Sequence, residues 1–416
     1  MTDQLVSAAA VHAAVADAHR KQWARVLAAV TRLTGDLDLA EECVQDAYSK
    51  ALTAWAVDGI PASPAAWLTT TARRMALDQL RRSATFRRKL PLLLDPGTHD
   101  EAEHSADVWP DDRLRLVFTC CHPALAVEAQ VALTLRLICG LTTSQVARGL
   151  LVGEATMAAR ITRAKKKIAG AGIPYRVPCA ADLPERVDAV CSVVYLLYTA
   201  GHTTAAGTDL TRPDLVERAL DLARMLRLLL PDNKDVAGLL ALILLTDARS
   251  GTRVDRDGRL QLLADQDRTR WDRAAIAEGV ALVREALSKR PPSRFALQGA
   301  IAAVHAESPS FSDTDWSEIL ALYDLLTARW PSPVVALNRA VAVGFAHGPA
   351  AGLVALNDLA AEPQLAQYPY LAAARADFHR QLNHHHDSRL AYEEALILTD
   401  NQAERDYLTA RIKALP

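Results

Sequence analysis

The chain has 416 residues, half of them hydrophobic and only 5% aromatic, with a formal net charge of −2. This length suggests two or three domains of about 100–200 residues each, and the abundance of Ala and Leu favours packed helices over sheets. The near-neutral charge gives no whole-molecule sign of nucleic-acid binding, and six irregularly spaced cysteines argue against a disulfide framework.

Secretion and membrane insertion are also disfavoured. Asp3, His12 and Asp17 interrupt the N-terminal stretch, which therefore lacks the basic-then-apolar pattern of a signal peptide. The longest apolar run, 236–245, is far shorter than the roughly 20 residues that span a bilayer. We therefore expect a cytoplasmic protein with no membrane partner.

Charge is distributed unevenly along the chain. Residues 73–89 carry seven basic and one acidic residue, 91–112 carry seven acidic and no basic, and 113–178 carry ten basic and two acidic. The rest of the chain is acidic overall. Two basic blocks on either side of an acidic linker are an asymmetry that calls for a functional explanation.

The first 90 residues predict three helices. The first helix covers about 12–33, and Gly35 can end it. Asp36 can cap a second helix. This second helix has an apolar stripe that extends to Trp55, and its opposite side is acidic. Ser63-Pro64 is typical of an N-cap followed by proline at the first helical position, so a third, basic helix follows. The charge pattern alone favours a generic helical hairpin with solvated charged faces.

The segments "DLDLAEECVQDAYSKALTAW" and "AAWLTTTARRMALDQLRR" resemble region 2 of the extracytoplasmic-function sigma factors, a compact group within the sigma-70 family. The resemblance implies that the acidic helix docks on core RNA polymerase and that the basic helix captures an unpaired base of the promoter −10 element. The implied polymerase-binding residues are Asp38, Glu41, Glu42, Gln45 and Asp46. The implied −10 residues are Arg73, Arg74, Asp78, Arg81 and Arg82.

Residues 91–111 have no helical periodicity, are acidic and contain prolines, which predicts a flexible linker between modules at 10–90 and 112–178. In the second module, Thr142 and Gln145 form a capping-box pattern before a short helix. A helix over 154–168 follows, with apolar residues on one side and a parallel polar stripe. Helix, turn and basic second helix are the pattern by which a helix-turn-helix enters the major groove.

The stretch "GLTTSQVARGLLVGEATMAARITRAKKKI" resembles region 4 of the same family, which implies reading of the promoter −35 element. The implied contact residues are Thr156, Arg160, Arg163, Lys165 and Lys167. The sequence departs from the family pattern at Leu151, Gly153, Ala158 and Ala159, where a turn Gly, a capping Ser and polar contact residues are usual. These departures bear on how tightly the helix binds DNA unaided.

The remainder, 183–416, predicts paired helices with short breaks. Ala at tight positions beside Leu, Tyr and Trp resembles tetratricopeptide-type repeats, in which each helix pair buries its apolar face against its neighbours. The expected helices lie at 183–199, 213–230, 235–250, 271–289, 295–307, 316–329 and 334–346, with three more to the end. The arrangement resembles the sigma-factor subgroup with such an extension, and implies either a regulatory domain with a protein or peptide ligand or a structural extension.

Three other groups of residues suggest metal binding, and none meets the requirements. Cys120-Cys121-His122 has no partner motif to complete the four ligands of a zinc site, so a buried cysteine pair is favoured. His384-His385-His386 is expected in a polar turn, where only adventitious metal binding is foreseen. Asp255-Arg256-Asp257-Gly258 begins like a calcium loop, but Arg259 and Gln266 break the ligand pattern, which leaves a tight turn.

The sequence therefore predicts an all-α protein with two sigma modules, a flexible linker and a tetratricopeptide-like α-solenoid. Its predicted function is that of a promoter-specificity subunit that binds core RNA polymerase and promoter DNA, without catalytic activity, cofactor or metal. Two alternatives remain open. One is a helical-repeat adaptor that binds DNA without joining polymerase, and the other is an enzyme that uses the C-terminal groove.

Overall fold

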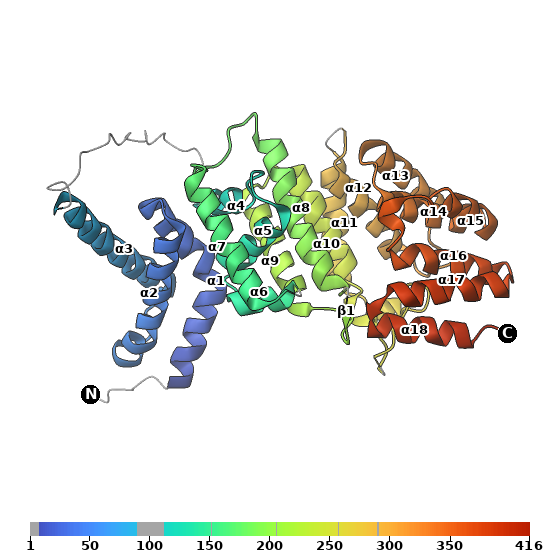
Figure 1. The fold of residues 1–416 in the computed structure, drawn as a ribbon, viewed down its shortest axis with the longest axis horizontal. Coiled ribbons are helices and arrows are strands. Elements are labelled where there is room, and N and C mark those ends of the chain that lie inside the picture. Colours follow the sequence, from blue (N-terminus) through green and yellow to red (C-terminus); the bar gives the residue numbers. More distant parts are fainter. Residues whose placement is uncertain (1–7, 90–111, 151, 205, 257, 289–290) are drawn as a thin grey trace. The chain divides into compact units, whose positions relative to one another are not determined.

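The computed structural model describes residues 8–89, 112–150, 152–204, 206–256, 258–288 and 291–416 (Figure 1). The predicted linker at 91–111 lies outside the described residues. The chain divides into two compact units, Met1–Val193 and Val194–Pro416. The described part is overwhelmingly helical, which confirms the all-α prediction.

Unit 1 begins with three helices that pack on one another: α1 (Ala8–Thr34), α2 (Leu37–Asp58) and α3 (Pro64–Lys89). Asp36 caps α2 as predicted, since its Oδ1 accepts hydrogen bonds from the backbone N–H of Asp38 (2.8 Å) and Leu39 (3.1 Å). Gly35 just before it has φ +65°, a left-handed conformation that glycine adopts without steric cost.

The second half of unit 1 contains α4 (Asp112–Cys120), α5 (Val127–Leu133), the π-helical turn η2 (Thr134–Ile138), α6 (Thr143–Gly149) and α7 (Glu154–Gly170). The capping box predicted at Thr142 and Gln145 is present in both directions. At the end of α5 the helix widens into η2. In that turn the Leu137 carbonyl accepts the indole N–H of Trp23 on α1 at 3.0 Å, a contact that local periodicity cannot reveal.

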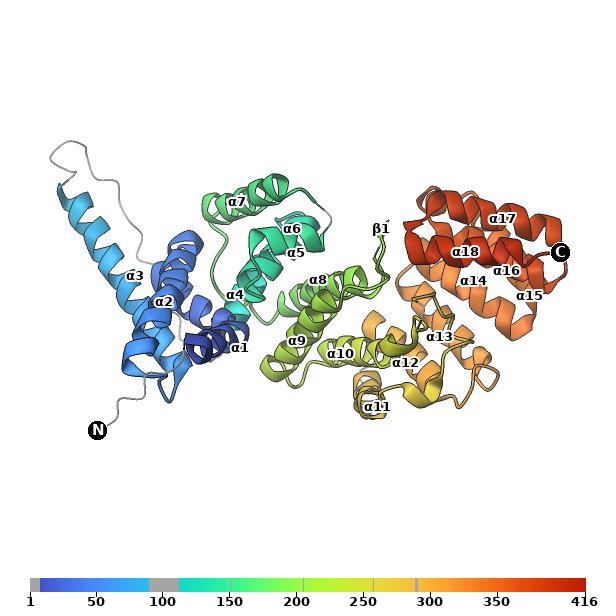
Figure 2. The same cartoon turned by 90° about the horizontal axis from the view of Figure 1, so that it is seen from below.

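Helix α8 (Leu183–His202) contains the boundary between the units. Unit 2 continues with consecutive helices that pack on their neighbours (Figures 1 and 2). They are α9 (Pro213–Leu229), α10 (Lys234–Asp247), α11 (Arg273–Leu287), α12 (Arg294–Glu307), α13 (Trp316–Arg329), α14 (Pro333–His347), α15 (Pro349–Asn357), α16 (Pro369–Gln381), α17 (His385–Leu398) and α18 (Gln402–Lys413). Four helices follow α14, not the three expected, because the short α15 adds one. Three single 3₁₀ turns lie between them: η3 (Ser250–Thr252), η4 (Arg268–Arg270) and η5 (Pro363–Leu365).

Asn401 joins two segments of unit 2 that are far apart in sequence. Strand β1 (Ala206–Gly207) pairs in parallel with β2 (Asp400–Asn401). The fully buried Asn401 amide donates to Thr204 Oγ1 (2.9 Å) and to the Asp209 carbonyl (3.1 Å), and its Oδ1 caps α18. One side chain therefore satisfies polar groups of both segments.

The segment after η3 contains the tight turn predicted at Gly258. Val254 and Leu260 form an antiparallel bridge, and the Asp255 N–H donates to the Arg259 carbonyl at 2.9 Å. Gly258 has φ +78°. Asp257 lies outside the described residues. Across the described part of the chain, no helix is long and apolar enough to cross a membrane.

The close packing of α14 on α16 at Gly344 can be tested by substitution. A Cβ at this position would collide with the Phe378 ring, so Gly344→Ala is expected to destabilise unit 2 by roughly 1–3 kcal/mol through overpacking. Gly251→Ala is the matched control, because its Cβ would meet nothing within 4 Å. Calorimetric melting of the full chain checks this, and equal melting temperatures for the two variants would contradict it.

Candidate functional site

Helix α2 presents an acidic surface, but one of its predicted polymerase-binding residues does not belong to it. Asp38, Glu42, Gln45 and Asp46 are exposed. Glu41 is only 6% exposed, and the Gln45 side-chain amide donates to its Oε1 at 3.0 Å. The exposed surface is therefore smaller than the sequence predicted.

Glu41 is buried because it sits between two cations from the second half of unit 1. Lys165 Nζ on α7 lies 2.6 Å from Glu41 Oε2 and 2.7 Å from Asp38 Oδ1. The Arg136 guanidinium, from the η2 turn, forms an ion pair with Glu41 Oε1. A residue predicted to bind polymerase and one predicted to bind −35 DNA thus bind each other, and we call Glu41, Arg136 and Lys165 the charge cluster.

The carboxylates of the charge cluster favour the charged form of Lys165. Burial by itself would lower the pKa of Lys165, but the carboxylates of Glu41 and Asp38 outweigh it and raise that pKa above its usual value. Each carboxylate oxygen of Glu41 has a cationic partner. Such a cluster tolerates burial only while every charge keeps its partner.

Two aromatic side chains support the same contact between the halves of unit 1. Tyr175, which follows α7, donates its hydroxyl to the Ala28 carbonyl of α1 at 3.0 Å. The Trp23 indole binds the η2 turn as described above. Sequence analysis missed Arg136 and Tyr175 as structural residues. No local motif marks them, because the contacts that join the two halves, Arg136 with Glu41 and Tyr175 with Ala28, link residues far apart in the chain.

Helix α3 carries the predicted −10 residues on its surface. All five are exposed: Arg73, Arg74, Asp78, Arg81 and Arg82. Asp78 and Arg81 form a loose pair at 3.9 Å. Spacings of four, three and one residues place Arg74, Asp78, Arg81 and Arg82 along one side of the helix. The side chains beyond Arg82 in this helix lie outside the described residues.

Helix α7 divides its polar residues between two directions. Met157, Ile161, Ala164 and Ile168 are buried, as predicted. Thr156, Arg163 and Lys167 are exposed and Arg160 is half-buried, so these four form a continuous stripe at helical spacing. Lys165 points elsewhere: its side chain is only 10% exposed and is held in the charge cluster. Gly153 stands at the N-cap without a side-chain cap, as its identity requires.

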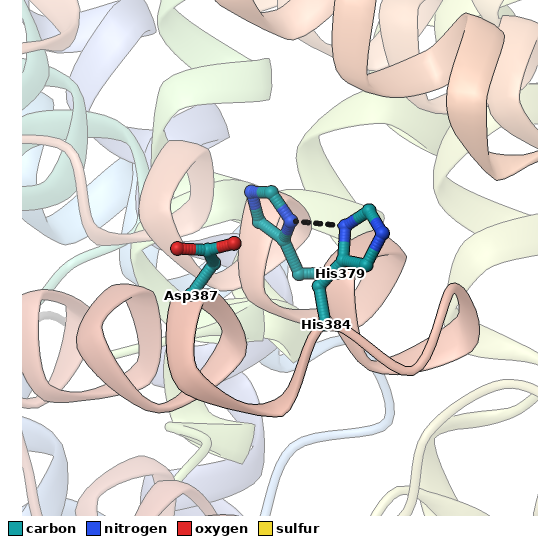
Figure 3. A group of neighbouring side chains, drawn as sticks. All are labelled: His379, His384 and Asp387. Atoms are coloured by element: carbon teal, nitrogen blue, oxygen red, sulfur yellow. Dashed lines mark hydrogen bonds between the residues drawn. The ribbon is translucent and has the colours of Figure 1, made fainter.

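The candidate metal ligands lie in two different environments. Cys120 and Cys121 are both buried, and burial raises the pKa of Cys121 to about 11, so the pair is a set of inert thiols, as favoured from the sequence. His379 and His384 lie with their Nδ1 atoms 3.4 Å apart, and Asp387 lies beside them (Figure 3). These three supply fewer ligands than a closed zinc site needs, and we assign them no metal.

Comparisons with known proteins connect these surfaces to a family. Residues 13–85 match sigma-70 region 2, 115–168 match sigma-70 region 4, and 186–287 match a family of unknown function, DUF6596. No solved structure matches the chain.

Similar sequences fall into two kinds. An uncharacterised protein of Rhizobium meliloti, R00370, is 39% identical over 396 residues, covering 94% of this chain and 93% of that protein. The ECF RNA polymerase sigma factor SigL of Mycobacterium tuberculosis is 34% identical over 156 residues, covering 37% of this chain and 86% of SigL. The probable ECF sigma factor SigI of the same species is 30% identical over 163 residues, covering 38% of this chain and 55% of SigI.

From the charge cluster we expect that mutating two neighbouring glutamates to Ala changes the free energy of unfolding by very different amounts. Glu41→Ala leaves Arg136 and Lys165 without their shared anion and is expected to lower the free energy of unfolding of unit 1 by about 3 kcal/mol. Glu42→Ala, at an exposed position one residue on, is expected to change it by less than about 0.5 kcal/mol. Urea denaturation measures both, and equal effects would show that the cluster contributes no stability.

Proposed function

Because the chain belongs to the extracytoplasmic-function group of the sigma-70 family of RNA polymerase sigma factors, we propose that it binds core RNA polymerase and directs promoter-specific initiation of transcription. The observation that carries this proposal is the pair of separate surfaces in unit 1, one acidic on α2 and one basic on α3. Each lies within a segment that matches sigma-70 region 2.

Helix α2 is proposed to bind polymerase through its exposed acidic and amide side chains, Asp38, Glu42, Gln45 and Asp46. Glu41 can join them only if α7 moves away, since Lys165 and Arg136 now hold it. The proposed polymerase surface and the charge cluster are therefore in competition for the same carboxylate.

Helix α3 is proposed to bind the −10 element through Arg73, Arg74, Asp78, Arg81 and Arg82. Capture of an unpaired base costs a few kcal/mol of unstacking, which phosphate contacts from neighbouring arginines offset. The exposure of all five side chains supports this role, because they remain accessible beside the described elements of unit 1.

Helix α7 is proposed to bind the −35 duplex through Thr156, Arg160, Arg163 and Lys167. Lys165 adds to this surface only after it leaves Asp38 and Glu41. Weak binding by each surface suffices, because joining both to polymerase raises their effective concentration on DNA.

Unit 2 is proposed to regulate the sigma modules by binding a protein or peptide ligand. Consecutive helices that pack on their neighbours support this role, since arrays of this kind present concave binding surfaces.

The polymerase surface is tested by reversing single exposed charges. Glu42→Lys and Asp46→Lys are each expected to weaken binding to bacterial core polymerase by about tenfold, since a misplaced charge in an interface costs at least about 1.4 kcal/mol. Asp58→Lys is the matched control, at an exposed acidic position at the end of the same helix. Fluorescence anisotropy measures the affinities. Unchanged binding in both variants would favour the adaptor alternative.

The DNA surface is tested by transcription in vitro. Arg74→Ala combined with Arg81→Ala is expected to reduce specific transcripts with core polymerase about tenfold or more while binding to core is retained, because two charged contacts are lost. Arg224→Ala combined with Arg284→Ala removes two exposed arginines of unit 2 and is expected to leave transcription unchanged. Failure of the unmodified chain both to bind core and to stimulate transcription would overturn the proposed function.

A further inference from the structure

Unit 2 contains a cavity of about 850 Å³ that is partly open to solvent. Its walls come from α8, α10, α12, α13 and α14 and are mainly aliphatic and aromatic, with Tyr195, Leu242, Ile301, Tyr323 and Tyr368 among the lining side chains. This volume falls in the range of about 300–1,000 Å³ that holds small ligands in proteins. A cavity of this size, lined by both apolar and polar side chains, is suited to a small ligand that combines an apolar body with polar groups.

Arg249, just after the end of α10, brings a positive charge to the wall of this cavity. Its charged neighbours are Arg253 and Arg268, two more cations. Burial and then these cations lower the pKa of Arg249 to about 10, so the guanidinium remains charged at neutral pH. Among the described residues, no carboxylate or other acceptor is found for its side chain. A recessed charge without an anion is unfavourable.

The two neighbouring arginines have structural roles that Arg249 lacks. Arg268 Nη1 donates to the carbonyls of His305 (2.7 Å) and Ser308 (2.6 Å), and so caps the end of α12. Arg253 donates to the His202 carbonyl and to Thr203 Oγ1. Both hold the chain in place. The Arg249 side chain makes no such contact in the described part of unit 2, and therefore has no evident structural purpose.

Two further polar atoms of the cavity wall lack partners. Gln298 Oε1 and His305 Nδ1, both on α12, are buried without a hydrogen bond. Burial, with the charges of Arg249 and Arg268, lowers the pKa of His305 to about 4, so its ring is neutral at pH 7. Buried polar groups are almost always paired, so these two atoms are available to bond a molecule in the cavity, whether water or a ligand. Gln298 Oε1 requires an N–H or O–H donor.

We propose that this cavity binds an organic carboxylate with a largely apolar body, its carboxylate paired with Arg249 and an N–H or O–H donated to Gln298. An N-acyl amino acid and the C-terminal residue of a peptide share this chemistry. The idea that such a ligand regulates transcription rests on the proposed function, but its binding to unit 2 does not.

The test compares acids with their amides on the full chain. The probes are N-benzoyl-leucine and a ten-residue peptide ending in Leu-Phe, each with a free carboxylate and as the C-terminal amide. At least one acid is expected to bind in isothermal titration calorimetry at least tenfold more tightly than its amide. Tighter binding of N-benzoyl-leucine identifies a free small molecule as the source, and tighter binding of the peptide identifies a protein C-terminus.

Variants at Arg249 separate this role from a structural one. Arg249→Met is expected to abolish the preference for acid over amide and to melt, without probe, at or above the temperature of the unmodified chain. Arg249→Lys keeps the charge and is expected to retain a reduced preference, and Arg284→Met controls for loss of an exposed arginine. Equal binding of acids and amides, no binding of any probe, or a preference that survives Arg249→Met would each overturn the proposal. None of these readouts depends on polymerase.

Discussion

The organisation of unit 1 depends on one buried carboxylate. Glu41 belongs by sequence to the acidic side of α2, yet it lies between Arg136 and Lys165 from the second half of the unit. A charge can be buried only if its partners are buried with it, so the cluster fixes α2, η2 and α7 relative to one another. The Trp23 and Tyr175 hydrogen bonds add neutral contacts at the same junction. The two modules that the sequence separates by a linker therefore form one compact unit.

This contact has a consequence for both proposed binding surfaces. Glu41 and Asp38 form ion pairs with Lys165. The remaining acidic residues of α2 are exposed, and the outer stripe of α7 is exposed except for the half-buried Arg160. A partner that needs every one of these charges has to replace the internal ion pairs with its own.

Unit 2 shows the opposite arrangement of charge. Arg253 and Arg268 satisfy backbone carbonyls, and Asn401 satisfies a junction between segments almost 200 residues apart. These polar side chains stabilise the fold. Arg249, Gln298 and His305 instead line a cavity, and in the described part of unit 2 their side chains lack protein partners there. A polar group that stabilises the fold has its hydrogen-bond partner within the protein. A polar group that binds a ligand lacks such a partner until the ligand is bound.

The sequence by itself determined the helical class, the caps at Asp36 and Thr142, and the buried stripe of α7, because each depends on residues within one turn or one helix face. It also determined the membership of the sigma-70 family through regions 2 and 4. Only the tertiary structure decided that Glu41 and Lys165 are paired, that η2 widens to meet Trp23, and that Arg249 lies unpaired at a cavity. These outcomes depend on partners distant in the chain. Burial, not residue type, decides whether a charged side chain is available to an external partner or is paired within the protein.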